Sequence, residues 1–521
     1  MSRPAGGREG GALGDARPTA RVFVEVPDHL AHKAAWVLRT LCDAAGCRLE
    51  VVRDRELAQS AVLAYAPRPV DGVPTIPLSA EASETIARGA DVPAGSFASF
   101  HSPAPLVGAF PVAGTGFALP FDLVASAFVI LAAWDEHTRP QRDRHGRFPY
   151  ELSFLATEAA LDAADPPLDG YARVLRRLLG EALDLTPPRW KGRSGGSLET
   201  PDAAPAARAG DTASIARSGD AAFAIALTHD VDHLHRWTPR AVAGSLRRAA
   251  LDARAGDRAT ARWELECLLR ALTDHLPAGT DPYWTFPELM EREDRLGVDS
   301  TFFAIASHHE RVDGVDARDY RRRLPALLRL LRHGGRETGL HGNSRDRVDP
   351  AALSEDRSSL KEMTAGAVEG IRFHFLRCLY HETLPLLEAA GFAYDSSLAF
   401  GAREGPRCGL SFPFRPYFLA QDRPLDLVEL PLVVMDGTLQ DRHYRDLPVD
   451  EGRAAAQRVL AAVRDVGGAA AILWHNTRLD PLVSRGYGQV YWDLIEWTRA
   501  NGGVATSAGD VVRQWRSAVG L

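Results

Sequence analysis

The residues most suited to chemistry are two aspartates, Asp230 and Asp232, which follow the apolar run of residues 222–227. A short apolar run that contains a β-branched residue is typical of a buried strand. On an extended backbone, residues i and i+2 point to the same side, so both carboxylates would enter one small volume. Carboxylates that close raise each other's pKa unless a cation or an arginine joins them. The pair predicts a functional site; capping of a following helix or binding to an arginine is the alternative interpretation.

Further polar residues follow later apolar runs of the chain. A single histidine after a strand is usually a surface or capping residue, but recurrence after successive strands is hard to explain by chance. We therefore expect these side chains to meet at one end of a sheet. They are His341 after residues 337–340, Arg372 and His374 at the end of residues 370–373, Asp395 after residues 392–394, and His475 after residues 470–474.

The elements that must position these residues alternate between strands and helices over residues 221–521. Repeated β-α units predict a parallel sheet closed into a barrel, with polar residues at the carboxyl ends of its strands. A doubly wound open sheet is the alternative, but no glycine-rich phosphate loop follows any strand. The predicted strands cover residues 222–227, 301–305, 337–340, 370–373, 392–394, 427–430, 470–474 and 503–506, and amphipathic helical stretches lie between them.

Residues 21–190 predict a smaller mixed α/β domain of unknown role. Its predicted strands cover residues 22–26, 48–52 and 61–65, and its predicted helices cover residues 31–45, 123–134 and 171–185. A polar cluster of His137, Arg144, His145 and Arg147 is interpreted as a solvated, charged loop. Residues 1–20 and 191–220 are rich in small residues and proline, so we expect a disordered tail and a flexible linker.

The composition excludes several classes of protein. The chain has 521 residues, which is too long for one ordinary core. The formal net charge of -7 disfavours a nucleic acid or an anionic membrane as partner. Five scattered cysteines without CxxC spacing indicate a reduced compartment without a disulfide framework. Residues 1–20 lack the apolar part of a signal peptide and residues 123–134 are too short to span a bilayer, so we expect a cytoplasmic protein.

Taken together, these motifs resemble those of the polysaccharide deacetylase family, the NodB-homology hydrolases of carbohydrate esterase family four. The resemblance covers residues 222–521 and implies a distorted (β/α)7 barrel. The family's first motif has a catalytic-base aspartate followed by a metal-binding aspartate, which implies Asp230 as the base and Asp232 as a ligand. Residues 337–341 resemble the start of the second motif, whose first histidine binds metal, and this implies His341 as a ligand.

The resemblance extends to three later motifs. Arg372 matches the arginine of the third motif, which orients the base, and Asp395 lies in the region of the fourth. Residues 473–476 resemble the fifth motif, whose histidine is the general acid, and this implies His475 in that role. The aromatic side chains near these positions could stack on a sugar ring; they are Trp474, Phe375 and Tyr394.

Two positions depart from the family's pattern. Arg345 stands where the second motif has another metal-binding histidine, and a cation cannot be a zinc ligand. His374 stands where the third motif usually has a proline. His374 could supply the missing ligand and complete a zinc set with Asp232 and His341, leaving one position open for water. Alternatively, Arg345 could take the place of a lost metal.

Three functions therefore remain open. The first is metal-dependent hydrolysis of an amide C–N bond, with an N-acetyl group on a carbohydrate as the expected substrate and zinc as the expected metal. The second is a metal-independent C–N hydrolase on the same barrel. The third is a non-catalytic carbohydrate-binding or scaffold protein. Convergence of Asp232, His341 and His374 on one point would favour the first, whereas Arg345 at that point would favour the others.

Overall fold

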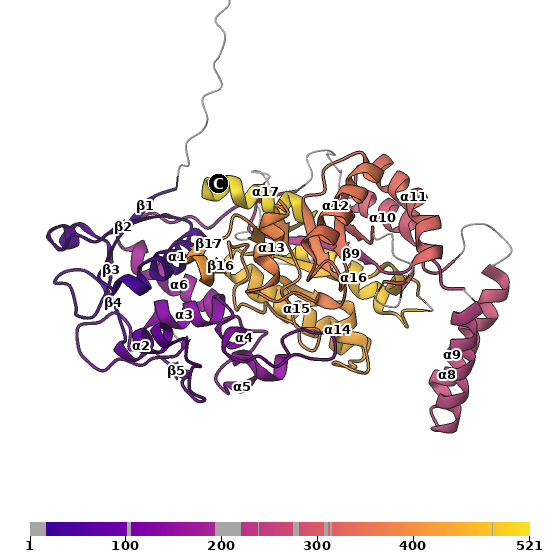
Figure 1. Cartoon of the computed structure of the whole chain (residues 1–521), viewed down its shortest axis with the longest axis horizontal. Coiled ribbons are helices and arrows are strands. Elements are labelled where there is room, and N and C mark those ends of the chain that lie inside the picture. The colour runs from indigo at the N-terminus through magenta and orange to yellow at the C-terminus, as the bar shows by residue number, and fades with distance from the viewer. Residues whose placement is uncertain are drawn as a thin grey trace, which may run out of the picture.

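The computed structural model of the protein describes residues 17–101, 106–192, 220–237, 239–274, 281–306, 311–312, 315–481 and 483–521. The amino-terminal region, indigo to purple in Figure 1, lies beside the carboxyl-terminal region, which runs from magenta through orange to yellow. Most of the predicted tail and of the predicted linker lies outside the described residues. The domain boundary expected at residues 191–220 therefore stays a prediction.

The amino-terminal region is mixed α/β, as predicted. Its four-stranded parallel sheet has the order β2-β1-β3-β4. The strands are β1 (Thr19–Val24), β2 (Arg48–Val52), β3 (Leu63–Ala66) and β4 (Thr75–Pro77), and β5 (Ala98–Phe100) pairs with β6 (Leu106–Gly108) beside them. The helices are α1 (Asp28–Ala45), α2 (Ala80–Arg88), α3 (Leu123–Leu131), α4 (Trp134–Thr138), α5 (Phe154–Thr157) and α6 (Pro167–Gly180).

Several element boundaries in this region differ from the predicted ones by a few residues. β1 begins at Thr19, two residues before the expected start of the domain, and pairs with β2. The helix expected over residues 171–185 begins at Pro167 and ends at Gly180. A proline is favourable in the first helical turn, because its fixed φ suits the helix and its missing N–H would have no partner there.

The carboxyl-terminal region is built on one nine-stranded parallel sheet. Eight strands follow the order β18-β15-β14-β13-β10-β9-β20-β19, and β21 also pairs with β9. All eight strands predicted from the sequence are present, which confirms the alternation of strands and helices; the strand β19 was missed. The strands are β9 (Phe223–Val231), β10 (Thr301–Ala304), β13 (Glu337–Gly342), β14 (Gly370–Phe373), β15 (Tyr394–Asp395), β18 (Val428–Glu429), β19 (Leu432–Met435), β20 (Ala469–Leu473) and β21 (Gly503–Thr506).

This sheet curls into the expected distorted barrel. Its two edge strands, β18 and β19, are consecutive in the chain and separated only by residues 430 and 431. The N–H of Leu430 donates to the carbonyl of Asp395 in β15, whereas the carbonyl of Pro431 accepts from Ala471 in β20. Two successive residues thus bond to opposite edges of the sheet, so the chain itself bridges the gap. The carboxyl ends of the strands consequently face one common mouth.

Helices surround the sheet and extend beyond it. They are α10 (Phe286–Leu296), α11 (Ala317–His333), α12 (Pro350–Thr364), α13 (Thr383–Ala389), α14 (Asp436–Gln440), α15 (Val449–Val466), α16 (Tyr487–Ala500) and α17 (Ala508–Val519). A helical hairpin of α8 (Pro239–Arg254) and α9 (Arg258–Asp274) projects from the body (Figure 1). Short antiparallel pairs are β7 (Trp190–Lys191) with β8 (Asp220–Ala221), β11 (Arg311–Val312) with β12 (Val315–Asp316), and β16 (Tyr417–Phe418) with β17 (Arg423–Pro424).

The two regions share one hydrophobic core. The ring of Trp36 in α1 lies 5.0 Å from the ring of Tyr417 in β16, and its indole N–H donates to the carbonyl of Arg415. In addition, Glu136 of α4 and Arg407 form a buried ion pair. A buried guanidinium needs such a carboxylate, because an unpaired buried charge is strongly unfavourable. The amino-terminal region is therefore packed against the barrel region through both aromatic and charged contacts.

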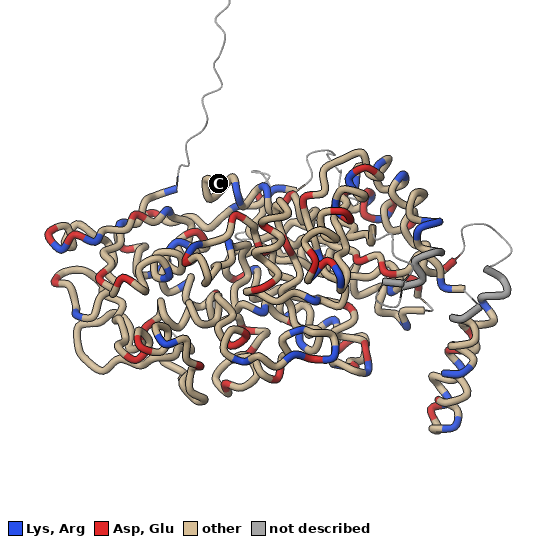
Figure 2. The backbone as a smooth tube through the Cα atoms, viewed as in Figure 1, with Lys and Arg blue, Asp and Glu red and all other residues tan. Residues whose placement is uncertain are grey.

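Charged residues of both signs are interspersed over both regions (Figure 2). Among the residues that the structure describes, no helix combines the length and the apolar character needed to cross a membrane.

Candidate active site

The two aspartates that follow the first barrel strand face one histidine. Asp230 lies near the end of β9 and Asp232 directly after it, so their side chains leave the same side of the strand. Asp232 Oδ1 is 3.0 Å from His341 Nε2, and Asp230 Oδ2 is 3.9 Å from His341 Nδ1. The register explains this meeting, because β9 and β13 are both neighbours of β10 in the parallel sheet.

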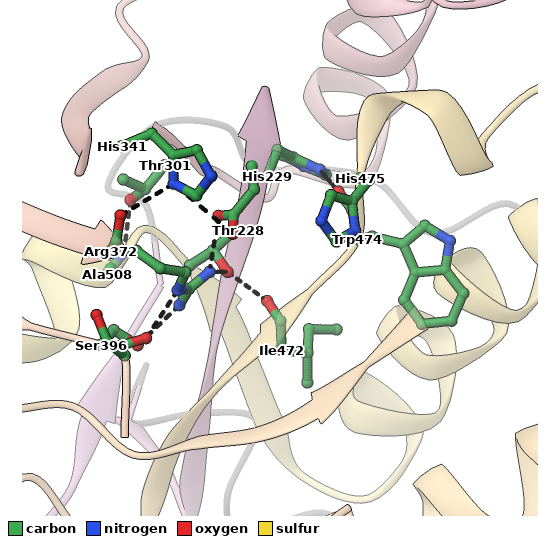
Figure 3. Close-up of polar contacts among 12 residues, drawn as sticks. Thr228, His229, Thr301, His341, Arg372, Ser396, Ile472, Trp474, His475 and Ala508 are labelled. Atoms are coloured by element: carbon green, nitrogen blue, oxygen red, sulfur yellow. Dashed lines mark hydrogen bonds and ion pairs between the residues drawn. The ribbon is translucent and has the colours of Figure 1, made fainter. Parts of the chain in front are cut away.

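Arg372 binds Asp230 from inside the barrel. Its guanidinium is fully buried and donates to Asp230 Oδ1 at 3.2 Å and to the hydroxyl of Thr228 at 2.6 Å. It also donates to the carbonyl and the hydroxyl of Ser396, both at 2.7 Å (Figure 3). The guanidinium lies over the ring of Phe303. These contacts hold the arginine in one orientation. A permanent positive charge thus lies beside the carboxylate of Asp230.

Asp232, His341 and His374 form a group whose geometry suits a metal ion. Each offers one ligand atom, and these atoms lie within 4.8 Å of one another. One carboxylate and two imidazoles are a typical donor set for zinc. The three histidines around Asp232 lower its pKa well below the usual value, although burial alone would raise it; in order of effect they are His374, His341 and His475.

A hydrogen bond of His341 fixes which of its two ring nitrogens faces Asp232. Its Nδ1 lies 2.9 Å from the carbonyl oxygen of Arg372, so Nδ1 must carry a proton. The other nitrogen then presents a lone pair to the carboxylate of Asp232, which is also only an acceptor. The contact needs a cation between the two atoms or a second proton on His341. Burial lowers the pKa of His341, but Asp230 and Asp232 together raise it above the usual value.

His475 reaches the same mouth from β20 and is held by a residue that sequence reasoning missed. Both its backbone N–H and its ring Nδ1 donate to the carboxylate of Asp436 at 2.7 Å. Its Nε2 lies 3.6 Å from Asp232 Oδ2. Burial lowers the pKa of His475, but the carboxylates of Asp436, Asp232 and Asp230 raise it to about 10.

Asp436 is fully buried and begins α14 directly after β19. Its pKa is low despite burial, because His475 and Arg478 lie close to it. The signal for Asp436 was present in the sequence, since it is a carboxylate directly after an apolar run. The prediction ended that run at residue 430 and therefore missed both β19 and the residue that follows it.

Asp395 lies apart from the group around Asp232. Its carboxylate accepts from the hydroxyl and the N–H of Ser397, whose hydroxyl in turn accepts from the N–H of Phe373 in β14. Its register partner in β18 is Glu429, also fully buried. Burial raises the pKa of both carboxyl groups, and Asp395 raises that of Glu429 further. Asp395 thus supports the backbone next to His374, and its direct catalytic role stays a prediction.

The three aromatic residues expected to bind a sugar lie in different environments. Trp474 is fully buried and packs beside Tyr491. Tyr394 is 1% exposed, and its hydroxyl donates to Glu337 at the start of β13, at the opposite end of the barrel from His341. Neither ring is accessible to a sugar, so these two expectations are wrong. Phe375 is 39% exposed beside His374 and remains available at the mouth.

Arg345 does not fill the position of the expected third ligand. Its side chain is 46% exposed, and its guanidinium lies 3.7 Å from Asp349 in an i,i+4 pair. The backbone at Arg345 forms an Asx turn, in which the side-chain oxygen of Asn343 accepts from the N–H of Arg345. His374 lies beside Asp232 instead, with 3.5 Å between Nε2 and Oδ1. The condition set for the metal-independent alternatives is therefore not met.

Comparison with known proteins separates the two regions. Residues 23–184 match the model of a family of unknown function, DUF7033. No curated protein matches the chain.

Several solved structures are similar to a little over half of the chain. An inferred polysaccharide deacetylase from Mycobacterium smegmatis has 20% identity and a TM-score of 0.38. An allantoinase has 13% identity and a TM-score of 0.38. A probable polysaccharide deacetylase from Pseudomonas aeruginosa has 14% identity and a TM-score of 0.37. Each comparison covers 57% of this chain and 91% of the other. The family that the sequence motifs resemble is thus also named for two of these structures. At these identities and TM-scores, we base the assignment of function on the geometry of the site.

Proposed function

We propose that this protein is a metal-dependent hydrolase of amide C–N bonds that removes an N-acetyl group from a carbohydrate. The convergence of Asp232, His341 and His374 carries the proposal, because it places a zinc-type donor set beside a buried aspartate–arginine pair and a histidine. Substrate, metal and residue roles all belong to this proposal.

The residues divide the reaction between a base and an acid. Asp230, which accepts a hydrogen bond from Arg372, takes a proton from the water whose oxygen attacks the carbonyl carbon. His475, held protonated by Asp436, gives a proton to the amide nitrogen as the C–N bond breaks. The products are acetate and the free amine of the sugar. Arg372 also prevents Asp230 from rotating, since the guanidinium is fixed by Ser396 and Thr228.

Asp232, His341 and His374 would hold the metal. A bound divalent ion would polarise the substrate carbonyl and lower the pKa of a bound water to about 7. The Nδ1–H of His341 donates to the carbonyl of Arg372, an outer contact that fixes the tautomer suited to a metal ligand. Phe375 would offer an apolar edge to the substrate at the mouth.

The decisive experiment combines metal analysis with an acetate-release assay. We expect the purified protein to bind about one zinc per chain, to release acetate from an N-acetylated oligosaccharide, and to lose this activity with a chelator. Readdition of zinc should restore it. The chelated protein should also unfold at a lower temperature, because a ligand at 100 times its Kd stabilises the native state by about 2.7 kcal/mol.

The variant His374→Ala should lose bound zinc, whereas Arg345→Ala should retain it, since the arginine side chain points away to Asp349. Activity that persists in a metal-free preparation would favour the metal-independent hydrolase. Zinc binding without turnover on any N-acetylated or amide substrate would favour the non-catalytic protein.

A further inference from the structure

A turn of the amino-terminal region reaches the mouth of the barrel. Residues 143–147 form this turn, which was expected to be a solvated loop. Asp143 closes it by accepting from the N–H groups of His145 and Arg147 and from the guanidinium of Arg147. Gly146 has a φ of 74°, which a residue without a Cβ adopts readily. The turn is therefore an ordered structure with its own internal bonds.

The turn contacts the chain directly after His374, over residues 374–377. Arg147 donates from Nη1 to the carbonyl oxygen of Phe375 at 3.0 Å, and Arg377 donates from Nε to the carbonyl of His145 at 3.1 Å. The imidazole of His145 stacks on the ring of Phe375, with 4.8 Å between centroids and 24° between planes. Two hydrogen bonds in opposite directions and a ring stack thus join the turn to this segment.

The same segment carries backbone strain. Phe375 and Leu376 have φ values of 58° and 56°, in the left-handed region that residues with a Cβ disfavour. Such conformations persist only where the surroundings hold them, and they cluster at functional sites. The carbonyl of Phe375, in the middle of the strained pair, is the one that Arg147 binds.

His374 is coupled to this segment through its ring. The imidazole of His374 stacks on Phe375 at 3.9 Å and 21°, so His374, Phe375 and His145 form a chain of stacked rings. His374 also begins the strained stretch, so its backbone position depends on the residues that follow. A ligand that departs from the resembled family's pattern is thus supported by the other region of the protein.

We infer that the amino-terminal region is part of the active site, in which His145 and Arg147 are positioning residues that hold His374 where it can bind the metal. This inference rests on the proposed function for the metal, while the positioning itself concerns only residues of this chain. It gives the amino-terminal region a role at the site.

The test uses the full chain and four variants. His145→Ala removes the stacked ring, Arg147→Ala removes the bond to Phe375, and His145→Phe keeps a flat ring. The control is His32→Ala, because His32 also joins the two regions, through Asp422, but at the loop between β16 and β17. Zinc affinity is measured by competition with a chelator. Amide hydrogen exchange of residues 373–378 is measured in the metal-free protein.

Loss of an outer partner of a metal ligand typically weakens metal binding 10- to 100-fold. We expect a loss of that order for His145→Ala and Arg147→Ala, together with faster exchange in residues 373–378. His145→Phe and His32→Ala should stay within about threefold of wild type in zinc affinity, given that positioning effects are at least 10-fold.

Zinc affinity and exchange that are unchanged in both alanine variants would overturn the inference and leave the proposed function intact. If the wild type binds no zinc, the proposed function fails. Hydrogen exchange of residues 373–378 then tests the positioning role by itself, and exchange that is unchanged in the alanine variants would overturn that role as well. If Arg147→Ala does not fold, the zinc affinity and the exchange of His145→Ala are compared with those of His145→Phe. This comparison removes the stacked ring but leaves Arg147 in place.

Discussion

Two groups of acids belong to the same barrel, and they differ in their partners. Asp230 and Asp232 at the end of β9 face Arg372 and three histidines. Asp395 and Glu429, in β15 and β18, face each other. Cationic partners hold the pKa of Asp232 low, whereas burial raises the pKa values of Asp395 and Glu429, and Asp395 raises that of Glu429 further.

The comparison shows that burial alone does not decide what a carboxyl group can do. An ionised carboxylate can take up a proton or bind a metal, whereas a protonated carboxyl group can do neither until it loses its proton. The first group is therefore suited to chemistry and the second to structure. Substitutions that replace a carboxylate by its amide separate the two cases, because the amide resembles only the neutral acid.

The largest effect is expected for Asp230→Asn. Removal of a general base typically lowers the rate 10²- to 10⁴-fold, and an amide cannot accept the proton. We expect kcat for acetate release to fall by this factor while the bound zinc stays near wild type, because the ligands are other residues. The activity assay and metal analysis on one preparation check this. Turnover within tenfold of wild type would show that Asp230 is not the base.

A smaller effect is expected for Asp436→Asn, which keeps the shape beside His475 and removes a charge. Asp436 is the strongest of the three carboxylates that raise the pKa of His475. Without it the pKa falls, so the acid is deprotonated at a lower pH. We expect the basic limb of the kcat–pH profile to shift to lower pH, with a loss of about 10- to 100-fold above that limb. If the basic limb of the profile does not shift, a group other than His475 is the general acid.

The smallest effect on turnover is expected for Glu429→Gln. Since the folded protein holds a proton on this pair, the amide is a close mimic, and kcat should change by less than about tenfold, below the usual effect of removing a general acid or base. A larger loss of kcat would show that Asp395 and Glu429 take part in the reaction, as Asp230 is proposed to do.

The same variant should alter how stability depends on pH. A carboxyl group with a raised folded-state pKa binds more protons in the folded than in the unfolded protein. Its contribution is fully present below the unfolded value of about 4.3 and is lost as the pH rises through the folded value. Wild type should therefore lose more unfolding free energy than Glu429→Gln between about pH 5 and pH 9, as measured by urea titration. Equal losses would mean that the pair is ionised throughout.

Much of the fold followed from local patterns. The eight predicted barrel strands are present because each apolar run is bounded by polar or turn residues, and buried parallel strands need such runs. β19 was missed because only residues 430 and 431 separate it from β18, so the two strands form one apolar run. The buried positions of Trp474 and Tyr394 were also missed, since an aromatic residue beside a polar motif does not reveal which way its ring points.

The sequence by itself determined which side chains would meet around Asp230. Residues at the ends of parallel strands must share one edge of the sheet, so Asp232, His341, His374, Arg372 and His475 were found from spacing and motif. Only the tertiary structure decided their partners. Asp436 joins His475, Arg345 turns away, and His145 and Arg147 come from a region more than two hundred residues earlier than Phe375. Such contacts depend on how separate elements pack, and no local pattern encodes that packing.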